Sequence, residues 1–380
     1  MTTFLLHDDA ISSPEMRHEI GEAIMDPLTF VEHEGRRIVV GSSLEEAIFE
    51  TREDVVDEFW NDDALGSEDL VRDQSFPKHL LDAELVFRAL QKLGVSSVSV
   101  PPSFQLLVAD YLREKGVTVQ VDPDAWAQRR RHKAPWELEG IERAQRAADT
   151  AMLTAARMLR EAEPTNGGLL RFEGEILTAE LIRLSMEGEL LSQGAESQDI
   201  IIQSGDACLR GHDLGTGPIL PDTSCVIDCF PRDRRTSVYS DMTRTFVPGE
   251  PSDRLRKLHE DCCAALEIAF ESIRPGTKDA FAKVAEFFDS QGHPTQLTHE
   301  GPGSLLSGFR HALGHGVGLA VHEQPWMGRR SDEFQVGDVV AVEPGLYFEG
   351  VGGVRIEDTV LVTADGVEHF TDPFPYKLEP

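Results

Sequence analysis

The chain has 380 residues, of which 36 are basic and 67 acidic, and a formal net charge of −31. That length exceeds one ordinary hydrophobic core and is expected to form two domains, while a hydrophobic content of 40% is typical of globular proteins. Because so negative a surface repels phosphate backbones and anionic lipid headgroups, nucleic acids and membranes are excluded as expected partners.

The first residues, MTTFLLHDDAISSP, do not resemble a secretory signal, because they lack a positively charged segment before the short apolar run. No stretch of the sequence approaches the ~20 apolar residues needed to span a bilayer. We therefore expect a cytoplasmic protein.

Residues 1–132 alternate strand-like and helix-like patterns and are expected to form an α/β domain. Two apolar runs, residues 28–31 and 37–40, flank Glu34 and Gly35, which predicts a β-hairpin. Further along, alternating patterns predict at least one parallel crossover. The elements predicted by these patterns are a helix over 81–93, a strand over 95–100, a helix over 106–115 and a strand over 117–121.

The composition changes at QRRRHKAP, residues 128–135, which holds four basic residues and a proline in an acidic chain. Such a run could mark a nucleic-acid patch, but its isolation favours a linker. We therefore expect the domain boundary between residues 132 and 133. A long helix should follow, because seven apolar residues recur at helical spacing, namely Ile141, Ala144, Ala147, Ala148, Met152, Ala155 and Leu159.

Residues 133–380 mix both kinds of pattern and are expected to form an α+β domain. Helical patterns cover residues 173–191, 252–273 and 278–291. Strand-like runs lie near Ile200, Cys225, Asp241, Val339 and Val354.

All five cysteines lie in this second half, and an odd, sparse number does not indicate a disulfide framework. Cys225 and Cys229 have the spacing of half a zinc ribbon, but the sequence offers no second pair. We expect buried free thiols.

Two aspartates adjoin strand-like runs in CVIDCFPRDRRTSVYSDMTRTF: Asp228 ends the run of Val226 and Ile227, and Asp241 begins the next. A carboxylate at the inner end of an apolar strand is costly unless it is paired, hydrogen-bonded or bound to a metal. On this segment alone a turn or cap role is the more common explanation, with a metal role as the alternative.

Three histidines are interleaved with glycines in GFRHALGHGVGLAVHEQP. His311 and His315 could lie one turn apart on a helix, as in some zinc pairs. However, the glycines let the backbone bend and approach a site closely. We therefore expect His311, His315 and His322 to project from an irregular loop.

Two glutamates lie in strand-like segments near the end of the sequence. In DVVAVEPGLYF, Ala341 and Glu343 share one strand face, and Glu343 precedes a Pro-Gly turn. In GGVRIEDTVLV, Arg355 and Glu357 share a face. Because a glutamate at the centre of a strand disfavours the sheet unless something holds it, either a salt bridge to Arg355 or a metal is indicated for Glu357.

Together these segments supply four carboxylates and one imidazole, a set that suits two Mn(II), Co(II) or Zn(II) ions better than a structural zinc. Two such ions lie ~3.5–4 Å apart and generate a hydroxide nucleophile near neutral pH. The sequence therefore predicts a hydrolytic two-metal centre, with Mn(II) as the preferred metal. Its carboxylate ligands would be Asp228, Asp241, Glu343 and Glu357, and its imidazole would come from one of the three histidines.

The order Asp, Asp, His, Glu, Glu, embedded in SDMTRTF, GHGVGLAVHE, EPGLY and GVRIED, closely resembles the pita-bread-fold metallopeptidases. Within them the chain is most similar to aminopeptidase P and prolidase, which cleave the bond before proline. The resemblance implies a creatinase/prolidase-like α/β domain over residues 1–132, used for substrate access or dimerisation, and a pita-bread catalytic domain over residues 133–380. It also implies a small peptide substrate and a homodimer.

The resemblance gives each of the five ligands a role. Asp241 and Glu357 would bridge the two metals, Asp228 would bind one metal, and His315 with Glu343 would bind the other. Glu343 would also handle the proton of the attacking water.

The resemblance extends to residues around the ligands. His322 would hydrogen-bond the substrate carbonyl and the oxyanion formed from it. His212 would contact the substrate backbone, and His311 would border the substrate pocket. Tyr347 and Arg355 would orient the ligands.

One departure from the family concerns the segment between Asp228 and Asp241, which are thirteen positions apart, more than the family's usual spacing. The extra length falls in PRDRRTSVY, and two added residues preserve strand alternation, so both ligands can still face inward. The substrate preference at this rim, and the choice between dipeptidase and aminopeptidase P activity, are left open. The alternatives are a non-peptidase hydrolase or lyase on the same scaffold, or a catalytically silent binding protein.

Overall fold

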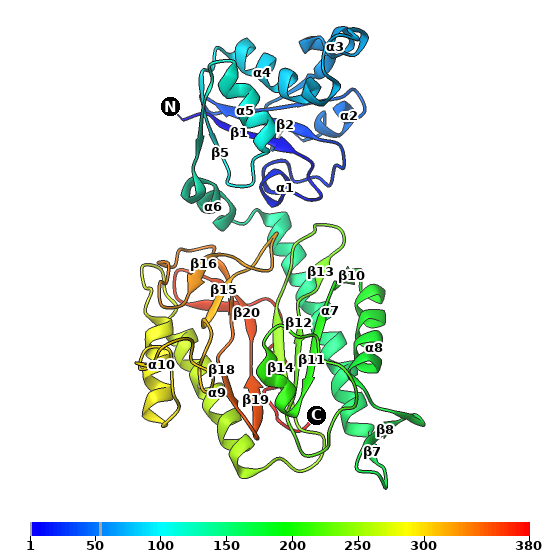
Figure 1. The fold of residues 1–380 in the computed structure, drawn as a ribbon, viewed down its shortest axis with the longest axis vertical. Coiled ribbons are helices and arrows are strands. Elements are labelled where there is room, and N and C mark those ends of the chain that lie inside the picture. Colours follow the sequence, from blue (N-terminus) through cyan, green and yellow to red (C-terminus); the bar gives the residue numbers. More distant parts are fainter. Residues whose placement is uncertain (1, 53–54) are drawn as a thin grey trace. The chain divides into compact units, whose positions relative to one another are not determined.

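The computed structural model describes residues 2–52 and 55–380, which form two compact units. The first unit ends at Arg130 and the second extends from Arg131 to Pro380 (Figure 1). Within the described residues, no helix is both long enough and apolar enough to cross a bilayer.

The first unit is built on a six-stranded mixed sheet with the order β4-β3-β2-β1-β5-β6. The predicted hairpin is confirmed, because β2 and β3 pair antiparallel across Glu34 and Gly35. Both turn residues have positive φ, 53° and 78°, which matches the right-handed twist of the strands. The strands are β1 (Phe4–Asp8), β2 (Leu28–His33), β3 (Arg36–Gly41), β4 (Glu58–Asn61), β5 (Ser97–Val100) and β6 (Thr118–Val121).

Helices cover this sheet and complete the predicted crossover. The segment from α4 through β5 and α5 to β6 places β5 and β6 parallel, as expected. One apolar cluster packs α4 and α5 against the sheet, and a second packs α1 and Trp126 of α6. The helices are α1 (Pro14–Ile20), α2 (Glu46–Phe49), α3 (Ser67–Arg72), α4 (Leu81–Leu93), α5 (Leu106–Glu114) and α6 (Pro123–Arg131), with short 3-10 helices η1 (Asp62–Leu65) and η2 (Lys78–Leu80).

The basic segment expected to be a linker is largely helical instead, since α6 continues to Arg131. Its charges are neutralised within each unit. Arg129 pairs with Glu19 and Glu32 in the first unit, and Arg131 pairs with buried Asp338 in the second. Because these guanidinium groups already hold carboxylates, they are poorly suited to binding phosphates.

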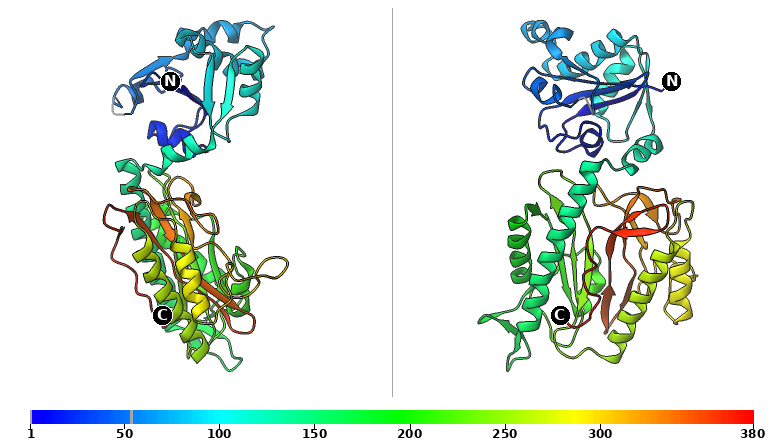
Figure 2. Two further views of the ribbon diagram at one scale, coloured as in Figure 1. Left: turned by 90° about the vertical axis from the view of Figure 1, so that its left-hand side faces the viewer. Right: turned by 180° about the vertical axis from the view of Figure 1, so that it is seen from behind.

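The second unit contains two main sheets, each backed by a pair of helices (Figure 2). One sheet has the order β11-β12-β14 and the other β16-β15-β17-β20-β21. Two strands of the first sheet, three of the second and the small β18-β19 ladder supply the site. The strands are β11 (Ile200–Ser204), β12 (Cys225–Cys229), β14 (Met242–Phe246), β15 (Gly314–Gly316), β16 (Glu323–Met327), β17 (Val339–Val342), β18 (Gly345–Phe348), β19 (Gly352–Arg355), β20 (Asp358–Val362) and β21 (Val367–His369).

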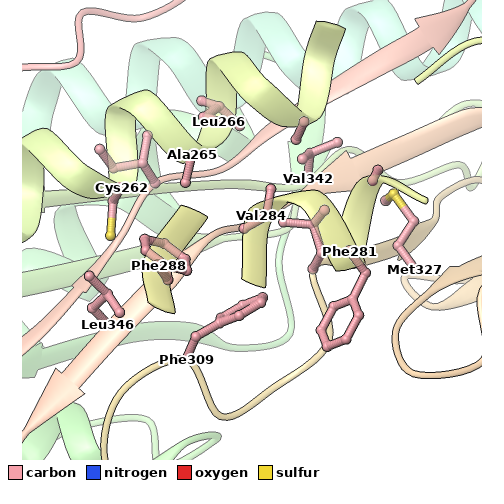
Figure 3. Packing of buried hydrophobic residues seen from close by; sticks show 14 of the residues in the cluster. Cys262, Ala265, Leu266, Phe281, Val284, Phe288, Phe309, Met327, Val342 and Leu346 are labelled. Carbon is pink, nitrogen blue, oxygen red and sulfur yellow. The ribbon is translucent and has the colours of Figure 1, made fainter. Parts of the chain in front are cut away.

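Helices α7 (Pro135–Glu161) and α8 (Ala179–Ser192) pack on the first sheet, and α9 (Asp253–Ser272) and α10 (Ala280–Ser290) on the second. Phe288 illustrates the second core, where its ring lies 5.2 Å from that of Phe309 (Figure 3). The predicted helix over 173–191 begins too early. Glu173 lies at a positive φ of 48° in the turn between β8 (Leu170–Phe172) and β9 (Glu175–Ile176), and Thr178 caps the helix.

Candidate metal centre

The two aspartates reach the site from neighbouring antiparallel strands. Asp228 lies within β12, and Asp241 immediately precedes β14. Because β12 pairs with β14 so that Asp228 lies opposite Thr243, Asp241 and Thr243 belong to one side of their strand. The alternation expected for the first motif therefore delivers both carboxylates to one region of the sheet.

The remaining three residues come from the second sheet and its junction with the first. His315 is in β15 and pairs with Ala341 of β17, so the expectation of an irregular loop is wrong for this residue. Glu343 follows β17, where its N–H donates to the carbonyl of Leu313. Glu357 lies between β19 and β20, where its N–H donates to the carbonyl of Thr243 and joins the two sheets.

Three of the predicted ligands converge closely. One donor atom each from Asp241, His315 and Glu357 lies within 4.8 Å of the others. The Nε2 atom of His315 is 3.8 Å from Oδ2 of Asp241 and 3.9 Å from Oε1 of Glu343. These distances are too long for hydrogen bonds and leave room between the side-chain atoms that could bind a metal.

The carboxylates of this cluster resist ionisation in the protein alone. Burial, followed by the charges of Glu357, Asp228 and Glu343, raises the pKa of Asp241 well above its usual value. The pKa of Glu357 is raised well above normal for the same reasons, and burial raises that of Glu343 to about 7. Buried like charges of this kind require a compensating positive charge.

His315 is held in the form that can bind a metal. Burial lowers its pKa to about 4, so the ring is neutral near pH 7. Its Nδ1 lies 3.1 Å from the carbonyl oxygen of Gly316, which can only accept, so Nδ1 carries the proton. The lone pair is therefore on Nε2, which faces Asp241 and Glu343.

Arg355 orders the groups around the ligands. Its Nη2 donates to Oδ2 of Asp228 at 2.6 Å, so the alternative of a salt bridge from Arg355 to Glu357 is wrong. Its Nη1 donates to Oη of Tyr347 at 2.8 Å, and Tyr347 in turn contacts Nε2 of His311 at 3.1 Å. Because Nδ1 of His311 faces the carbonyl of Ala312, Nε2 accepts the tyrosine proton.

Thr243 is a functional neighbour that the sequence motifs did not single out. Its hydroxyl donates to Oε2 of Glu357 at 2.6 Å and accepts from Nε of Arg355 at 3.2 Å. Strand alternation in SDMTRTF was the available signal, because it places Thr243 on the face of Asp241.

Replacing Arg355 with methionine should weaken binding of the metal held by Asp228 by about 10–100-fold, because Asp228 loses the group that orients it. Calorimetric titration of the metal-free protein with Mn(II) measures this change. Arg355→Lys keeps the charge but not the fork that contacts Asp228 and Tyr347, so it should restore only part of the affinity. Unchanged affinity in Arg355→Met would contradict the assigned role.

The donor set fits divalent metal ions. Asp228 and Asp241 each have one buried oxygen, Oδ1, without a hydrogen-bond partner among the described residues. Unpaired buried carboxylate oxygens are rare, and they are explained when an ion is their partner. Oxygen-rich sites with one imidazole are typical of Mn(II), Co(II) and Zn(II).

His322 and His212 lie at the edge of this cluster. The ring centroid of His322 is 4.3 Å from that of His315, in an edge-to-face arrangement, and the side chain is exposed. Burial and then the neighbouring His212 lower the pKa of His322. Both side chains are therefore accessible to a ligand from solvent, and their contacts with substrate stay predictions.

The long segment between Asp228 and Asp241 forms a ribbon that packs on α7. Its strand β13 (Arg232–Asp233) pairs with β10 (Ala195–Glu196), and Asp233 accepts two hydrogen bonds from Arg143 of α7. Gly140 makes this packing possible, because a Cβ there would lie 2.2 Å from Oγ1 of Thr236. The extra length is thus anchored to the helix while both aspartates still reach the cluster.

A family model, metallopeptidase family M24, matches residues 139–364 of this chain. The Xaa-Pro dipeptidase of Pyrococcus horikoshii is 30% identical over 292 residues, which are 75% of each protein. The chain belongs to metallopeptidase family M24. A probable dipeptidase, PepE, of Mycobacterium tuberculosis is 40% identical over 129 residues, covering 34% of this chain and 32% of that protein.

Solved structures extend the comparison to both units. The Xaa-Pro dipeptidase from Bacillus anthracis matches with a TM-score of 0.76 at 21% identity, covering 99% of this chain and 94% of the other. The X-Pro aminopeptidase from Thermotoga maritima matches with a TM-score of 0.74 at 22% identity, covering 99% and 97%. These likenesses confirm the expected fold, an α/β domain followed by an α+β pita-bread domain.

The metal-free M24 chain should become less stable as pH rises above about 6.5. Between pH 4.5 and 6.5 the buried residues His311 and His315 oppose this trend. Burial lowers their pKa values in the folded protein, so the unfolded chain binds more protons there and their contribution to stability rises with pH. Above that range the carboxyl groups of Asp241, Glu343 and Glu357 still favour the protonated folded state, so unfolding releases protons and stability falls.

We expect Tm to fall by about 5 °C between pH 6.5 and pH 8, because ionising such a group costs about 1–2 kcal/mol and ~1 kcal/mol moves Tm by ~2–4 °C. Thermal melts after chelation, in matched salt, measure the change. Added Mn(II) should remove most of it. A metal-free Tm that rises or stays constant over this range would contradict the electrostatic account.

Proposed function

We propose that this chain is a two-metal exopeptidase that hydrolyses the Xaa-Pro bond of dipeptides or of peptide N-termini. The observation that carries the proposal is the convergence of Asp241, His315 and Glu357 beside unpaired carboxylate oxygens of Asp228 and Asp241. Relatives named Xaa-Pro dipeptidase and X-Pro aminopeptidase support the choice of substrate.

Two Mn(II) ions, with Co(II) or Zn(II) as alternatives, would be held by the five predicted ligands. When bound, they would supply Lewis acidity and a water-derived nucleophile at neutral pH. Asp241 and Glu357 would contact both ions, and the position of each at the junction of the two sheets supports this assignment. The full ligand set is Asp228, Asp241, His315, Glu343 and Glu357.

The chain's own side chains would then manage protons and orientation. Glu343, a carboxyl group whose pKa burial raises when no metal is bound, would handle the proton of the attacking water. His322, neutral near pH 7, would donate a hydrogen bond to the substrate carbonyl as charge develops on its oxygen. His212 would contact the substrate backbone.

One side of the proposed substrate site would be formed by Arg355, Tyr347 and His311. The hydrogen-bond chain from Arg355 through Tyr347 to the carbonyl of Ala312 fixes the imidazole of His311 in one tautomer. That fixed imidazole would border the substrate beside Glu343, whose Oε2 lies 3.7 Å from Nδ1 of His311. We further propose that the enzyme is a cytoplasmic homodimer in which the first domain, predicted over residues 1–132, serves substrate access or dimerisation.

The test is a panel of peptides offered to protein that has been stripped with a chelator and reloaded with Mn(II). Ala-Pro and Ala-Pro-Ala should be compared with Pro-Ala and Ala-Ala. The proposal predicts cleavage before proline only, lost on chelation and recovered with metal. Cleavage of Ala-Pro alone identifies a dipeptidase, whereas cleavage of neither proline peptide would favour a non-peptidase enzyme on this scaffold.

A further inference from the structure

Trp326 lies directly across the sheet from the proposed metal ligand His315. Strand β16 is the edge strand of its sheet, next to β15 (Figure 1), and the antiparallel register places Trp326 opposite His315. Residues that face each other in such a pair point to the same side, with Cβ atoms about 4.5–5.5 Å apart. The indole therefore lies on the face that carries the metal centre.

The neighbouring residue confirms this orientation. Met327, opposite Gly314, is buried in the core with Phe281 and Phe309, as Figure 3 shows. Because successive side chains of a strand alternate between faces, Trp326 must point away from that core. It is 43% exposed, so the site face at this edge is open to solvent.

The backbone that carries Trp326 is firmly held. Its N–H donates to Oδ2 of Asp332 at 2.8 Å, and its carbonyl accepts from the N–H of Asp332 at 2.9 Å. The indole itself has no aromatic or hydrogen-bonded partner within the part of the chain that the structure describes. A rigidly placed, unpartnered aromatic side chain beside a catalytic cluster is suited to receiving an apolar group of a ligand.

The arrangement of charge indicates which part of a peptide would reach it. Asp228 and Asp241 come from β12 and the start of β14 in the first sheet, whereas His315 and Trp326 come from β15 and β16 in the second. The free amino group of an exopeptidase substrate can donate hydrogen bonds to these carboxylates, also when they hold metal ions. The residue after the scissile bond then lies toward His315 and Trp326.

We propose that Trp326 is a specificity-determining residue that packs against the pyrrolidine ring of the proline after the scissile bond. This inference rests on the proposed function. An indole face and a pyrrolidine ring exclude water from each other, and the contact favours a ring at this position over an open side chain.

The kinetic test compares Trp326→Ala and Trp326→Phe with the Mn(II)-loaded wild type on Ala-Pro and Leu-Pro. Trp326→Ala should raise KM about ten- to thirtyfold for both peptides, with kcat within about threefold and metal content unchanged. Trp326→Phe should recover most of the affinity. Leu184→Ala, an exposed position on α8, is the matched control and should change nothing.

Two outcomes would overturn the inference. One is an unchanged KM in Trp326→Ala. The other is a KM that rises much more for Leu-Pro than for Ala-Pro, which would place the indole against the first residue of the substrate. Failure of the proposed function is distinguishable, because the wild type itself would then leave both peptides intact.

A readout independent of turnover is acrylamide quenching of tryptophan fluorescence. Bound proline should protect the component that Trp326→Phe removes, and equal quenching with and without proline would contradict the contact.

Discussion

Glutamine in place of Glu357 should remove bound metal and lower activity on Ala-Pro at least about a thousandfold, the loss expected when the nucleophile is no longer generated. Glu357 joins the two sheets through its backbone, and its carboxylate lies close to the carboxylate of Asp241 and the imidazole of His315. Glutamine preserves the shape and can still accept from Thr243, but it removes the negative charge that a divalent ion requires.

The same substitution should not damage the fold. Because the charge of Glu357 is unfavourable in the metal-free protein, Glu357→Gln should melt at or above the temperature of metal-free wild type at pH 8. Metal content by mass spectrometry and peptide hydrolysis should be measured together. Glu368→Gln, an exposed position on β21 of the same sheet, is the matched control. Full metal content in Glu357→Gln would refute the ligand assignment.

Alanine in place of His322 should separate catalysis from metal binding. We expect kcat to fall about 10²–10³-fold, the usual cost of losing a hydrogen-bond donor to the developing oxyanion. Metal content should stay near that of the wild type, because the His322 ring packs on His315 without being one of the five ligands.

The readout for His322→Ala is steady-state kinetics beside a metal count on the same preparation. His79→Ala, at an exposed histidine in the 3-10 helix η2 of the first unit, controls for removing an imidazole. Equal losses of metal and turnover in His322→Ala would show that His322 supports the centre structurally, not through the substrate.

Local chemistry made much of the fold predictable. The hairpin at Glu34 and Gly35 follows from residues that accept positive φ, and α4 follows from its apolar spacing. The start of α8 was missed for an equally local reason. A second turn at Glu173 and the cap at Thr178 delay the helix, and apolar spacing alone does not reveal either.

The residues of the site were predictable by type and order, but their pairing was not. Alternation along single strands singled out Glu343 and Glu357. The partner of Arg355 could not be found that way, because Asp228 is far away in the sequence and is brought close only by the register between sheets. Trp326 escaped notice for the same reason, since only the pairing of β16 with β15 places it beside His315.

The measurement that tests the central claim most directly is anomalous diffraction from crystals of the Mn(II)-loaded protein, recorded on both sides of the manganese absorption edge. The account predicts two manganese sites per chain, with Asp241 and Glu357 contacting both ions and His315 contacting one. A single ion, or manganese bound away from these residues, would contradict it.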